Sequence, residues 1–465
     1  MLAIHTKSWD RAVLVLVMAV FVPSLRPLKA QDQNASAANF KFTKVDSALL
    51  DEVNEQNRQL EKKGLVFHEP GVESYVEQVG KKLLVDQAPL ENVEFHFRVL
   101  RDPMVNAFAF PNGSVYVTTG LLGALENEAQ LASVLGHEAT HVINRHTYLE
   151  NRSMRKKVLA INILQGIAAS MPQPTGSSAG SAFGVTVVSI ALGAQVASIF
   201  VEATIFGYSQ DKEREADRNG YELMSRASYD PRAMARTFEL LDEKLEFEPI
   251  EGFYRTHPKL EERRKTALER SEAASLKDAQ MGTESDYLAH VAPAICANIE
   301  ADLNSRRART AVARASRLTK WKPDEPKYQV LLGDAYRGLG AKTAEPTEEE
   351  QGRHGQAEHR KLYFQMTEQE EQTKLLAKPD GGATRSANLD KAEKLYIGAI
   401  EQNPNYADAH RELGFLYEQQ SKSADAAREY RKYLEITAGT SLDRLRIERR
   451  LAQLEKAILP RAPER

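Results

Sequence analysis

Residues 133–146, SVLGHEATHVINRH, place three histidines and a glutamate in a segment that otherwise has the pattern of an apolar helix. His137 and His141 are four residues apart, so a helix carries both imidazoles on one face, one turn apart. Glu138 projects beside that face, where a carboxylate can accept a proton from water. This His-Glu-x-x-His spacing predicts a zinc site in which both histidines are ligands and Glu138 is the general base.

A third ligand is needed, because a catalytic zinc site takes three protein ligands and leaves one position open. His146 is the nearest candidate, but it lies about 140° around the helix from His141. No glycine between the two residues would turn the chain back toward the metal. We therefore expect His146 to be a hydrogen-bonding partner that anchors the helix, and not a ligand.

Better donors follow in a second predicted helix within residues 208–224, YSQDKEREADRNGYELM. Glu213 and Asp217 are four residues apart there, so one carboxylate can bind zinc while the other accepts the spare ring N–H of a ligand histidine. Glu215 is the competing choice, but it points about 200° away from Glu213 around the helix.

Three segments in this order resemble the M48 peptidases, whose members are membrane-bound or exported zinc metalloproteases: VNAFAFPNGSVYVTTGLL (105–122), LASVLGHEATHVINRH (131–146) and EREAD (213–217). The resemblance covers roughly residues 45–270. It implies one zinc ion per chain. The ligands that it implies are His137, His141 and Glu213, with Glu138 as catalytic base and Asp217 supporting a ligand histidine.

One departure from the family pattern concerns the start of the second helix. The family often has Ser-Arg there, whereas this chain has Ser209 and Gln210, so any ion pair made by that arginine is absent.

The fold class that these patterns predict is mainly α with a small β-sheet, an α+β metallopeptidase domain of the zincin type. Helical periodicity covers residues 45–66 and 71–85, alternation suggests a strand within 93–100, and a Pro-Asn-Gly turn predicts a hairpin at 105–122. Asn127 is a suitable cap for the helix that carries the zinc motif.

The resemblance also suggests where substrate binds. In zinc peptidases of this kind an edge strand beside the metal pairs with extended substrate. We expect that edge at residues 114–119, so the candidate substrate-binding residues are Ser114, Val115, Tyr116 and Val117. The alternative is that this is only a core strand of the hairpin.

His257 is the last candidate site residue. It precedes Pro258 and a helix rich in arginine and glutamate, so the imidazole could be held on a loop at a helix start. A His-Pro pair at this place is usual in the M48 family. We expect His257 to stabilise the oxyanion or to cap the open zinc position, and the alternative is a helix cap.

Two apolar segments bear on location. Residues 1–30 have Lys7 and Arg11 before an apolar run and Leu28 and Ala30 before a cleavage point, which predicts a signal peptide and a periplasmic protein. Residues 158–207 predict a helical hairpin within the metallopeptidase domain, 31–275, that packs over the active-site cleft and can contact a membrane through 182–207. The alternative is a transmembrane hairpin.

The C-terminal part, residues 281–465, has a different pattern. Tyr396 and Tyr430 are 34 residues apart, which is the period of tetratricopeptide helix pairs, and a charged insertion covers about 341–388. Such repeats present concave surfaces to protein partners. The alternative is a plain helical bundle.

The combination of domains resembles periplasmic M48 proteases that use repeats to engage outer-membrane assembly machinery or clients and degrade stalled proteins. It implies an exported zinc endopeptidase that acts on unfolded or misassembled envelope proteins. A non-proteolytic chaperone or adaptor with the same fold is the second hypothesis. The formal net charge of -3 gives no attraction to nucleic acid, so that class of partner is not expected.

Overall fold

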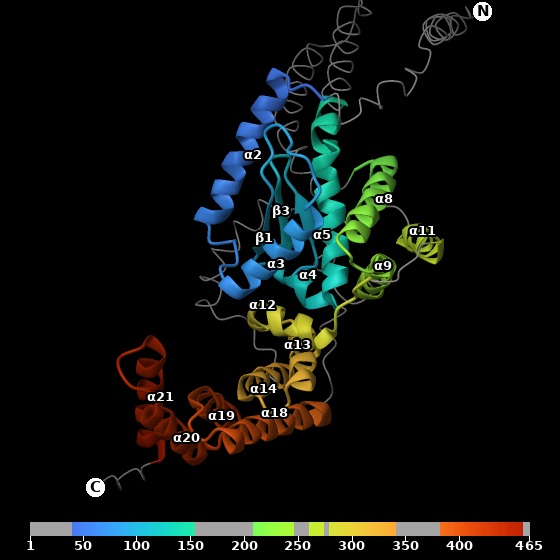
Figure 1. Cartoon of the computed structure of the whole chain (residues 1–465). Coiled ribbons are helices and arrows are strands. Elements are labelled where there is room, and N and C mark those ends of the chain that lie inside the picture. Colours follow the sequence, from blue (N-terminus) through green and yellow to red (C-terminus); the bar gives the residue numbers. More distant parts are fainter. Residues whose placement is uncertain (1–39, 154–207, 246–259, 274–278, 341–381, 459–465) are drawn as a thin grey trace, which may run out of the picture.

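The computed structural model describes residues 40–153, 208–245, 260–273, 279–340 and 382–458 (Figure 1). The peptidase part contains α2 (Lys44–Lys62), α3 (Pro70–Leu83), β1 (His96–Leu100), β2 (Ala107–Ala109), β3 (Ser114–Thr118), α4 (Thr119–Ala124), α5 (Glu128–Ile143), α8 (Gln210–Arg226), α9 (Arg232–Leu245) and α11 (Leu260–Ala273). The remaining helices are α12 (Glu284–Asn304), α13 (Ala308–Trp321), α14 (Pro326–Gly340), α18 (Gly382–Gln402), α19 (Ala407–Gln419), α20 (Ser423–Ile436) and α21 (Leu442–Ile458). The prediction of a mainly helical chain with a small sheet is confirmed.

The helix starts follow from local capping chemistry. Thr43 and Asp46 form a capping box at the start of α2, and the Glu69 carboxylate accepts a hydrogen bond from the Val72 N–H before α3. Asn127 caps α5 as predicted, since its side chain accepts a 3.0 Å hydrogen bond from the Gln130 N–H. These caps satisfy backbone donors that a helix leaves unpaired at its first turn.

The sheet has three strands in the order β1-β3-β2, with β1 parallel and β2 antiparallel to β3. The Pro-Asn-Gly turn joins β2 to β3, and Gly113 occupies it at φ +100°, a conformation that suits glycine. A Cβ at this position would also lie 2.3 Å from the Glu94 carbonyl oxygen, so the turn has no room for a side chain.

The predicted substrate edge is wrong, because β3 is the central strand. Its backbone is paired with β1 on one side and β2 on the other, and its five residues are all buried. Ser114 and Tyr116 contact Asn57 of α2, whereas Val115 and Val117 lie in the core on the other face. Ser114, Val115, Tyr116 and Val117 are therefore structural in position. β1 and β2 are the outer strands, and the outer edge of β1 bonds to residues 65–67, so among the described residues β2 has the edge left for pairing.

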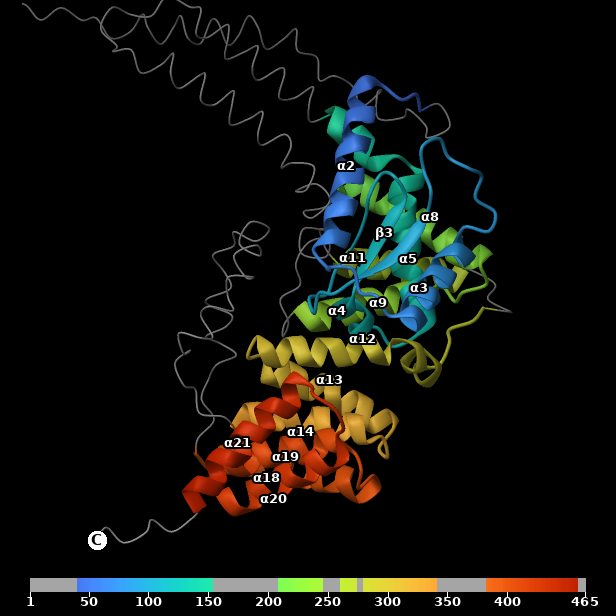
Figure 2. The ribbon, with the colours of Figure 1, turned by 90° about the vertical axis from the view of Figure 1, so that its left-hand side faces the viewer.

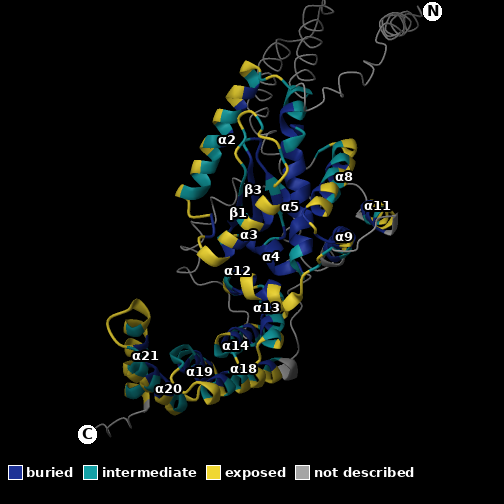
Figure 3. Ribbon diagram, in the orientation of Figure 1, coloured by how far each residue is buried: buried dark blue, intermediate teal, exposed yellow. Residues whose placement is uncertain are grey.

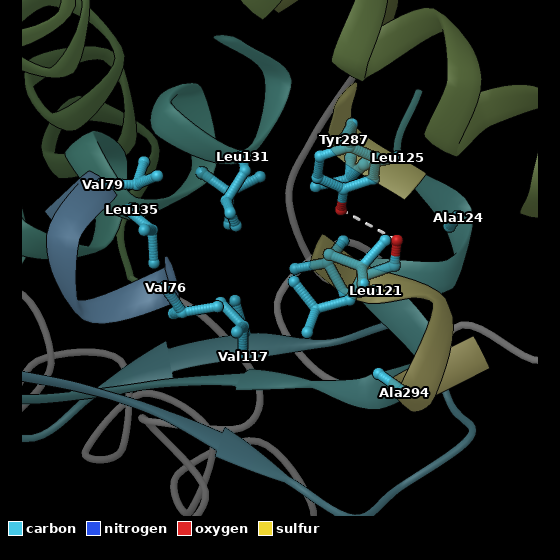
Figure 4. Close-up of a cluster of buried hydrophobic side chains, with 14 of the residues drawn as sticks. Val76, Val79, Val117, Leu121, Ala124, Leu125, Leu131, Leu135, Tyr287 and Ala294 are labelled. Carbon is cyan, nitrogen blue, oxygen red and sulfur yellow. Dashed lines mark hydrogen bonds between the residues drawn. The ribbon is translucent and has the colours of Figure 1, made fainter. Parts of the chain in front are cut away.

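Helices cover both faces of the sheet (Figures 1 and 2). α2 packs on one face, while α3 and α5 lie on the other. Figure 4 shows the core between the sheet and these helices, where Val117 of β3 lies among Val76, Leu131 and Leu135. This packing fixes α5, the helix that carries the zinc motif.

The core continues into the region after residue 281. Tyr287 of α12 donates a 2.8 Å hydrogen bond to the Leu122 carbonyl of α4 (Figure 4). Asn298 of the same helix donates one of 2.6 Å to the Thr119 carbonyl. Apolar side chains of α12, α13 and α14 belong to the same buried cluster as those of α5. The first helices after the predicted boundary therefore pack as part of the peptidase core.

A glycine-tyrosine contact occurs twice among the later helices. A Cβ on Gly333 would lie 2.5 Å from the Tyr396 ring, and a Cβ on Gly414 would lie 2.3 Å from the Tyr430 ring. Both tyrosines are fully buried, so small and large residues interlock at equivalent places in two helix pairs. α18 begins at Gly382, so the last residues of the predicted insertion, 341–388, belong to this helix.

Three predicted features lie outside the described residues: the signal peptide at 1–30, the whole apolar segment 158–207, and His257. Within the part of the chain that the structure describes, no helix combines the length and apolar character needed to cross a membrane.

Candidate metal centre

α5 is buried along almost its whole length, including its polar residues (Figure 3). His137, Glu138 and His141 are each no more than 4% exposed. Ionisable groups are rarely buried to this extent unless they are paired or bind a metal. The predicted motif therefore lies inside the domain, with its side chains shielded from bulk water.

α8 crosses α5 at a point where both helices carry a glycine. A Cβ on Gly220 would lie 3.0 Å from the His137 backbone nitrogen, and a Cβ on Gly136 would lie 3.3 Å from the Gly220 carbonyl oxygen. Side chains here would hold the two backbones apart. The glycine crossing therefore allows α8 to bring its carboxylates against the histidines of α5.

The three predicted ligands converge at this crossing. The His137 Nε2 and His141 Nε2 atoms are 3.0 Å apart, and the Glu213 carboxylate oxygens lie 3.3 Å from the first and 3.5 Å from the second. One donor atom from each residue lies within 4.8 Å of the others, and all three residues are buried. His146 does not belong to this group.

The donor set fits a zinc ion. Two imidazole nitrogens and one carboxylate are a common ligand set of catalytic zinc. Each imidazole uses its Nδ1 in another hydrogen bond, so both Nε2 atoms can direct lone pairs toward the same point. A cation or a proton between them relieves the repulsion between these lone pairs.

The pKa of His137 agrees with this picture. Burial alone would lower it, but hydrogen bonds to the Asp217 and Glu213 carboxylates raise the pKa to about 9. In the absence of metal the His137 ring is therefore protonated on both nitrogens and positively charged at neutral pH.

Glu138 is placed for proton transfer. It is 1% exposed, and its Oε1 atom has no hydrogen-bond partner among the described residues. Burial raises the pKa of this carboxyl to about 7, and the nearby Glu213 charge adds to the effect. A carboxyl with a pKa near the working pH can both accept and return a proton.

Asp217 holds His137 and is held in turn by an arginine. Its Oδ1 atom lies 2.8 Å from His137 Nδ1, as predicted for a residue that supports a ligand. Arg263 of α11 donates two hydrogen bonds to the same carboxylate, of 2.6 and 2.8 Å. The guanidinium also lies over the Phe238 ring, with its carbon 4.4 Å from the centroid. Burial opposes ionisation of Asp217, but the Arg263 charge and hydrogen bonds lower its pKa strongly.

Arg263 is not among the site residues predicted from the sequence. This residue is 46 positions after Asp217, in a segment whose many charges made no single arginine stand out. One signal in the sequence could have pointed to it. Gln210 replaces the arginine that the family often has at the start of this helix, so the carboxylates of α8 need an arginine from another segment.

His146 lies beside His141, although no glycine precedes it. α5 ends at Ile143, and Arg145 adopts a left-handed φ of +56° that turns the chain back. The two Nδ1 atoms of His141 and His146 are then 2.9 Å apart. The prediction that nothing breaks the helix here is wrong, whereas the predicted hydrogen-bonding role of His146 agrees with the geometry.

Tyr208 covers the other side of His141. The two rings are stacked with centroids 4.0 Å apart and an interplanar angle of 16°. The Tyr208 hydroxyl lies 2.6 Å from the hydroxyl of Thr147, which belongs to the helical segment after the turn at residues 144–145. The imidazole is thus enclosed by an aromatic face and a hydrogen bond, which restrict its rotation.

The chain is similar to known metalloproteases over this region. The pattern of Peptidase family M48 matches residues 70–271. The Beta-barrel assembly-enhancing protease of Yersinia pestis is 29% identical over 235 residues, covering 50% of this chain and 45% of the relative. The protein of that name from Escherichia coli K12 is 30% identical, covering 46% and 42%.

A mitochondrial relative shares the same region. Mitochondrial metalloendopeptidase OMA1 of Arabidopsis thaliana is 30% identical over 176 residues, or 38% of this chain and 31% of the relative. The chain thus spans less than half the length of each of these relatives. The matched segment contains the glycine crossing, all three converging ligands, Glu138, Asp217 and Arg263. The match to Peptidase family M48 and the converging donors thus fall in the same part of the chain.

Proposed function

We propose that this chain is a zinc-dependent endopeptidase. The observation that supports this most directly is the buried convergence of His137, His141 and Glu213. Glu138 lies on α5 with the two histidines, and one of its carboxylate oxygens has no hydrogen-bond partner among the described residues. An adaptor that only binds clients has no need for a buried donor set and a general base. The complete set therefore favours the enzyme over the chaperone hypothesis.

The residues of the site have three separate roles: metal binding, proton transfer and the positioning of a ligand. His137, His141 and Glu213 would hold the zinc ion, which would supply a positive charge that polarises the peptide carbonyl and activates water. Glu138 accepts the proton of the attacking water and returns it to the leaving amine. Asp217 and Arg263 keep His137 in the orientation needed for binding.

We propose that extended substrate pairs with β2. The hydrogen bonds of Asn106 and Phe110 to β3 imply that Ala107 and Ala109 direct their backbone groups to the opposite edge. β2 also packs against α5, so this edge lies next to the helix that carries the zinc motif. Backbone pairing at such an edge binds many sequences, as a protease for unfolded proteins requires.

The substrates that we propose are unfolded or misassembled envelope proteins. Relatives named for enhancing β-barrel assembly support this class of substrate, and the predicted signal peptide supports a periplasmic location. The helices after residue 281 would bind protein partners or clients on their surface. Membrane contact through 182–207 remains a prediction.

The test is a comparison of the purified full chain with Glu138→Gln. We expect about one zinc per chain in both proteins and cleavage of unfolded casein by the wild type alone. The Gln side chain has nearly the same size as Glu but cannot accept the proton, so activity should fall by at least about 100-fold. Glu222→Gln, an exposed change on α8, is the control and should keep full activity.

Two outcomes would contradict the proposal. A wild-type protein without zinc would remove its chemical basis. Equal cleavage by the wild type and Glu138→Gln, with zinc bound, would show that Glu138 is not the base.

A further inference from the structure

α8 presents acidic side chains at three alternate positions, and each one reaches a different part of the site. Glu213 joins the converging donors, and Asp217 bonds to His137. Glu215 lies between them in sequence and was set aside because it points away from Glu213. It reaches the site through His146, which gives the second ligand histidine its own chain of hydrogen bonds.

This second chain is defined by three contacts. His141 Nδ1 lies 2.9 Å from His146 Nδ1, and His146 Nε2 lies 3.3 Å from Glu215 Oε2. Asn144 donates a 2.9 Å hydrogen bond to the other oxygen of Glu215. His146 is 1% exposed, so the middle of the chain is closed to solvent.

The valence of the two rings fixes where the protons lie. Binding through Nε2 leaves a proton on Nδ1 of His141, so His146 must accept it with a lone pair on its own Nδ1. The proton of neutral His146 is then on Nε2, where it can be donated to the Glu215 carboxylate. Every donor in this chain thus has an acceptor.

We propose that His146 and Glu215 are positioning residues that hold His141 in the tautomer and orientation needed to bind zinc. This inference rests on the proposed function, since it assumes that His141 is a ligand. His137 is held by Asp217 and Arg263, and His141 is held by His146 and Glu215. Both chains are anchored on α8, so one helix supplies a ligand and the supports of the other two.

The backbone around His146 is held in place for this contact. Arg145 adopts its left-handed conformation while its guanidinium donates a 2.7 Å hydrogen bond to the Glu91 carbonyl. Its carbon also lies 5.5 Å from the Phe40 ring centroid and 5.4 Å from that of Phe42. These contacts offset the free-energy cost of the left-handed conformation of Arg145. Without them, that cost would favour a longer α5 in which His146 is turned away from His141.

The experiment compares two substitutions of His146 in the full chain. The Oδ1 atom of His146→Asn can take the place of Nδ1 and accept the His141 proton, whereas His146→Leu removes the acceptor. Zinc affinity is measured by competition with a chelator. We expect His146→Leu to bind zinc about 10- to 100-fold more weakly than the wild type, and His146→Asn to lose less than about tenfold.

A change at Glu215 tests the outer end of the hydrogen-bonded series from His141 through His146 to Glu215. It does not disturb the core, because the Glu215 side chain is 42% exposed. We expect Glu215→Ala to weaken zinc binding about tenfold, and Glu222→Ala, on the exposed part of the same helix, to have no effect. The ring N–H proton of His141, observed by NMR in the zinc-loaded protein, should be slow to exchange in the wild type and fast in His146→Leu.

The outcomes separate this inference from the proposed function. Tight zinc binding by the wild type and equally by all His146 and Glu215 variants would overturn the inference alone. A lower melting temperature of the metal-free variants with unchanged zinc affinity would show a purely structural role and also overturn it. A wild type that binds no zinc would overturn the proposed function and this inference with it.

Discussion

Two buried arginine-aspartate pairs illustrate how similar chemistry serves different ends in the two parts of the molecule. Arg263 and Asp217 join α11 to α8 at the metal centre. Arg314 and Asp302 join α13 to α12, in the helices that follow residue 281. Both arginines are less than 8% exposed, so each pair is shielded from solvent.

The difference lies in the third group that each pair contacts. Asp217 shares one oxygen between Arg263 and His137, so the pair holds an imidazole in place. Arg314 instead donates a 3.0 Å hydrogen bond to the Pro103 carbonyl, in the loop that leads from β1 to β2. The first pair therefore supports ligand geometry, whereas the second attaches the C-terminal helices to the peptidase domain.

The largest effect that we expect is a loss of stability in Arg314→Met. The change leaves the fully buried Asp302 with one fewer partner and the Pro103 carbonyl without its donor. Breaking a buried ion pair costs about 3 to 5 kcal/mol when the remaining charge has no other partner. Because Arg307 still pairs with Asp302, we expect a loss of about 2 to 3 kcal/mol. Urea unfolding followed by fluorescence should show this, because Trp321 lies on the same helix as Arg314.

The control for this change is Lys320→Met, an exposed position on α13. Equal stability of the two variants would mean that the Arg314 pair contributes little. Zinc affinity of folded Arg314→Met should match the wild type, and a large drop there would remove the distinction between the two pairs.

The second prediction concerns Arg263→Met, which should weaken zinc binding about 10- to 100-fold. Without the guanidinium, the Asp217 charge acts on His137 alone and holds its proton more firmly. The proton compensates the carboxylate in the metal-free protein, so the loss of stability should be smaller than in Arg314→Met. Chelator competition and urea unfolding measure the two effects, with Lys265→Met as the exposed control on α11. Unchanged zinc affinity would contradict the role assigned to Arg263.

The sequence predicted those parts of the site that depend on local spacing. His137, Glu138 and His141 follow from helix geometry, and the capping side chains fix the helix starts. Glu213 and Asp217 were recognised because four residues also make one helical turn. The family resemblance then distinguished their roles.

The parts that the sequence did not predict depend on contacts between distant segments. Arg263 reaches Asp217 only because α11 packs beside α8, and no local pattern reports that packing. The central place of β3 depends on a parallel partner, β1, whose position spacing alone cannot give. The turn at Arg145 was missed because left-handed residues are usually glycine or asparagine.

The third prediction is a dependence of zinc affinity on pH. The pKa of His137 is raised to about 9 in the metal-free protein, and zinc requires the neutral ring. Binding must therefore displace a proton at every pH below about 9, so affinity should fall about tenfold for each unit of decrease. Titrations at pH 8 and pH 7 would measure the slope. A zinc affinity that does not change with pH in the wild type would mean that the His137 ring is already neutral without metal. The same result in Arg263→Met would mean that Arg263 has no part in this pH dependence.

The smallest effect concerns glycines at helix contacts in the two regions. Alanine at Gly220 places a methyl group 3.0 Å from the His137 backbone nitrogen, so α8 must move by a few tenths of an ångström. Alanine at Gly398 of α18 meets only the Gln329 side chain, which can move aside. Alanine favours a helix over glycine by about 1 kcal/mol, and this gain applies at both positions.

The two substitutions should therefore differ in zinc binding more than in stability. Gly398→Ala should raise the free energy of unfolding by up to about 1 kcal/mol and leave zinc affinity unchanged. In Gly220→Ala the helix gain offsets the steric cost, so stability changes by less than about 1 kcal/mol. Zinc affinity should still fall severalfold, because the shift of α8 carries Glu213 and Asp217 away from the histidines. Equal zinc affinity in both variants would show that the site tolerates movement of α8, and that the close crossing serves packing alone.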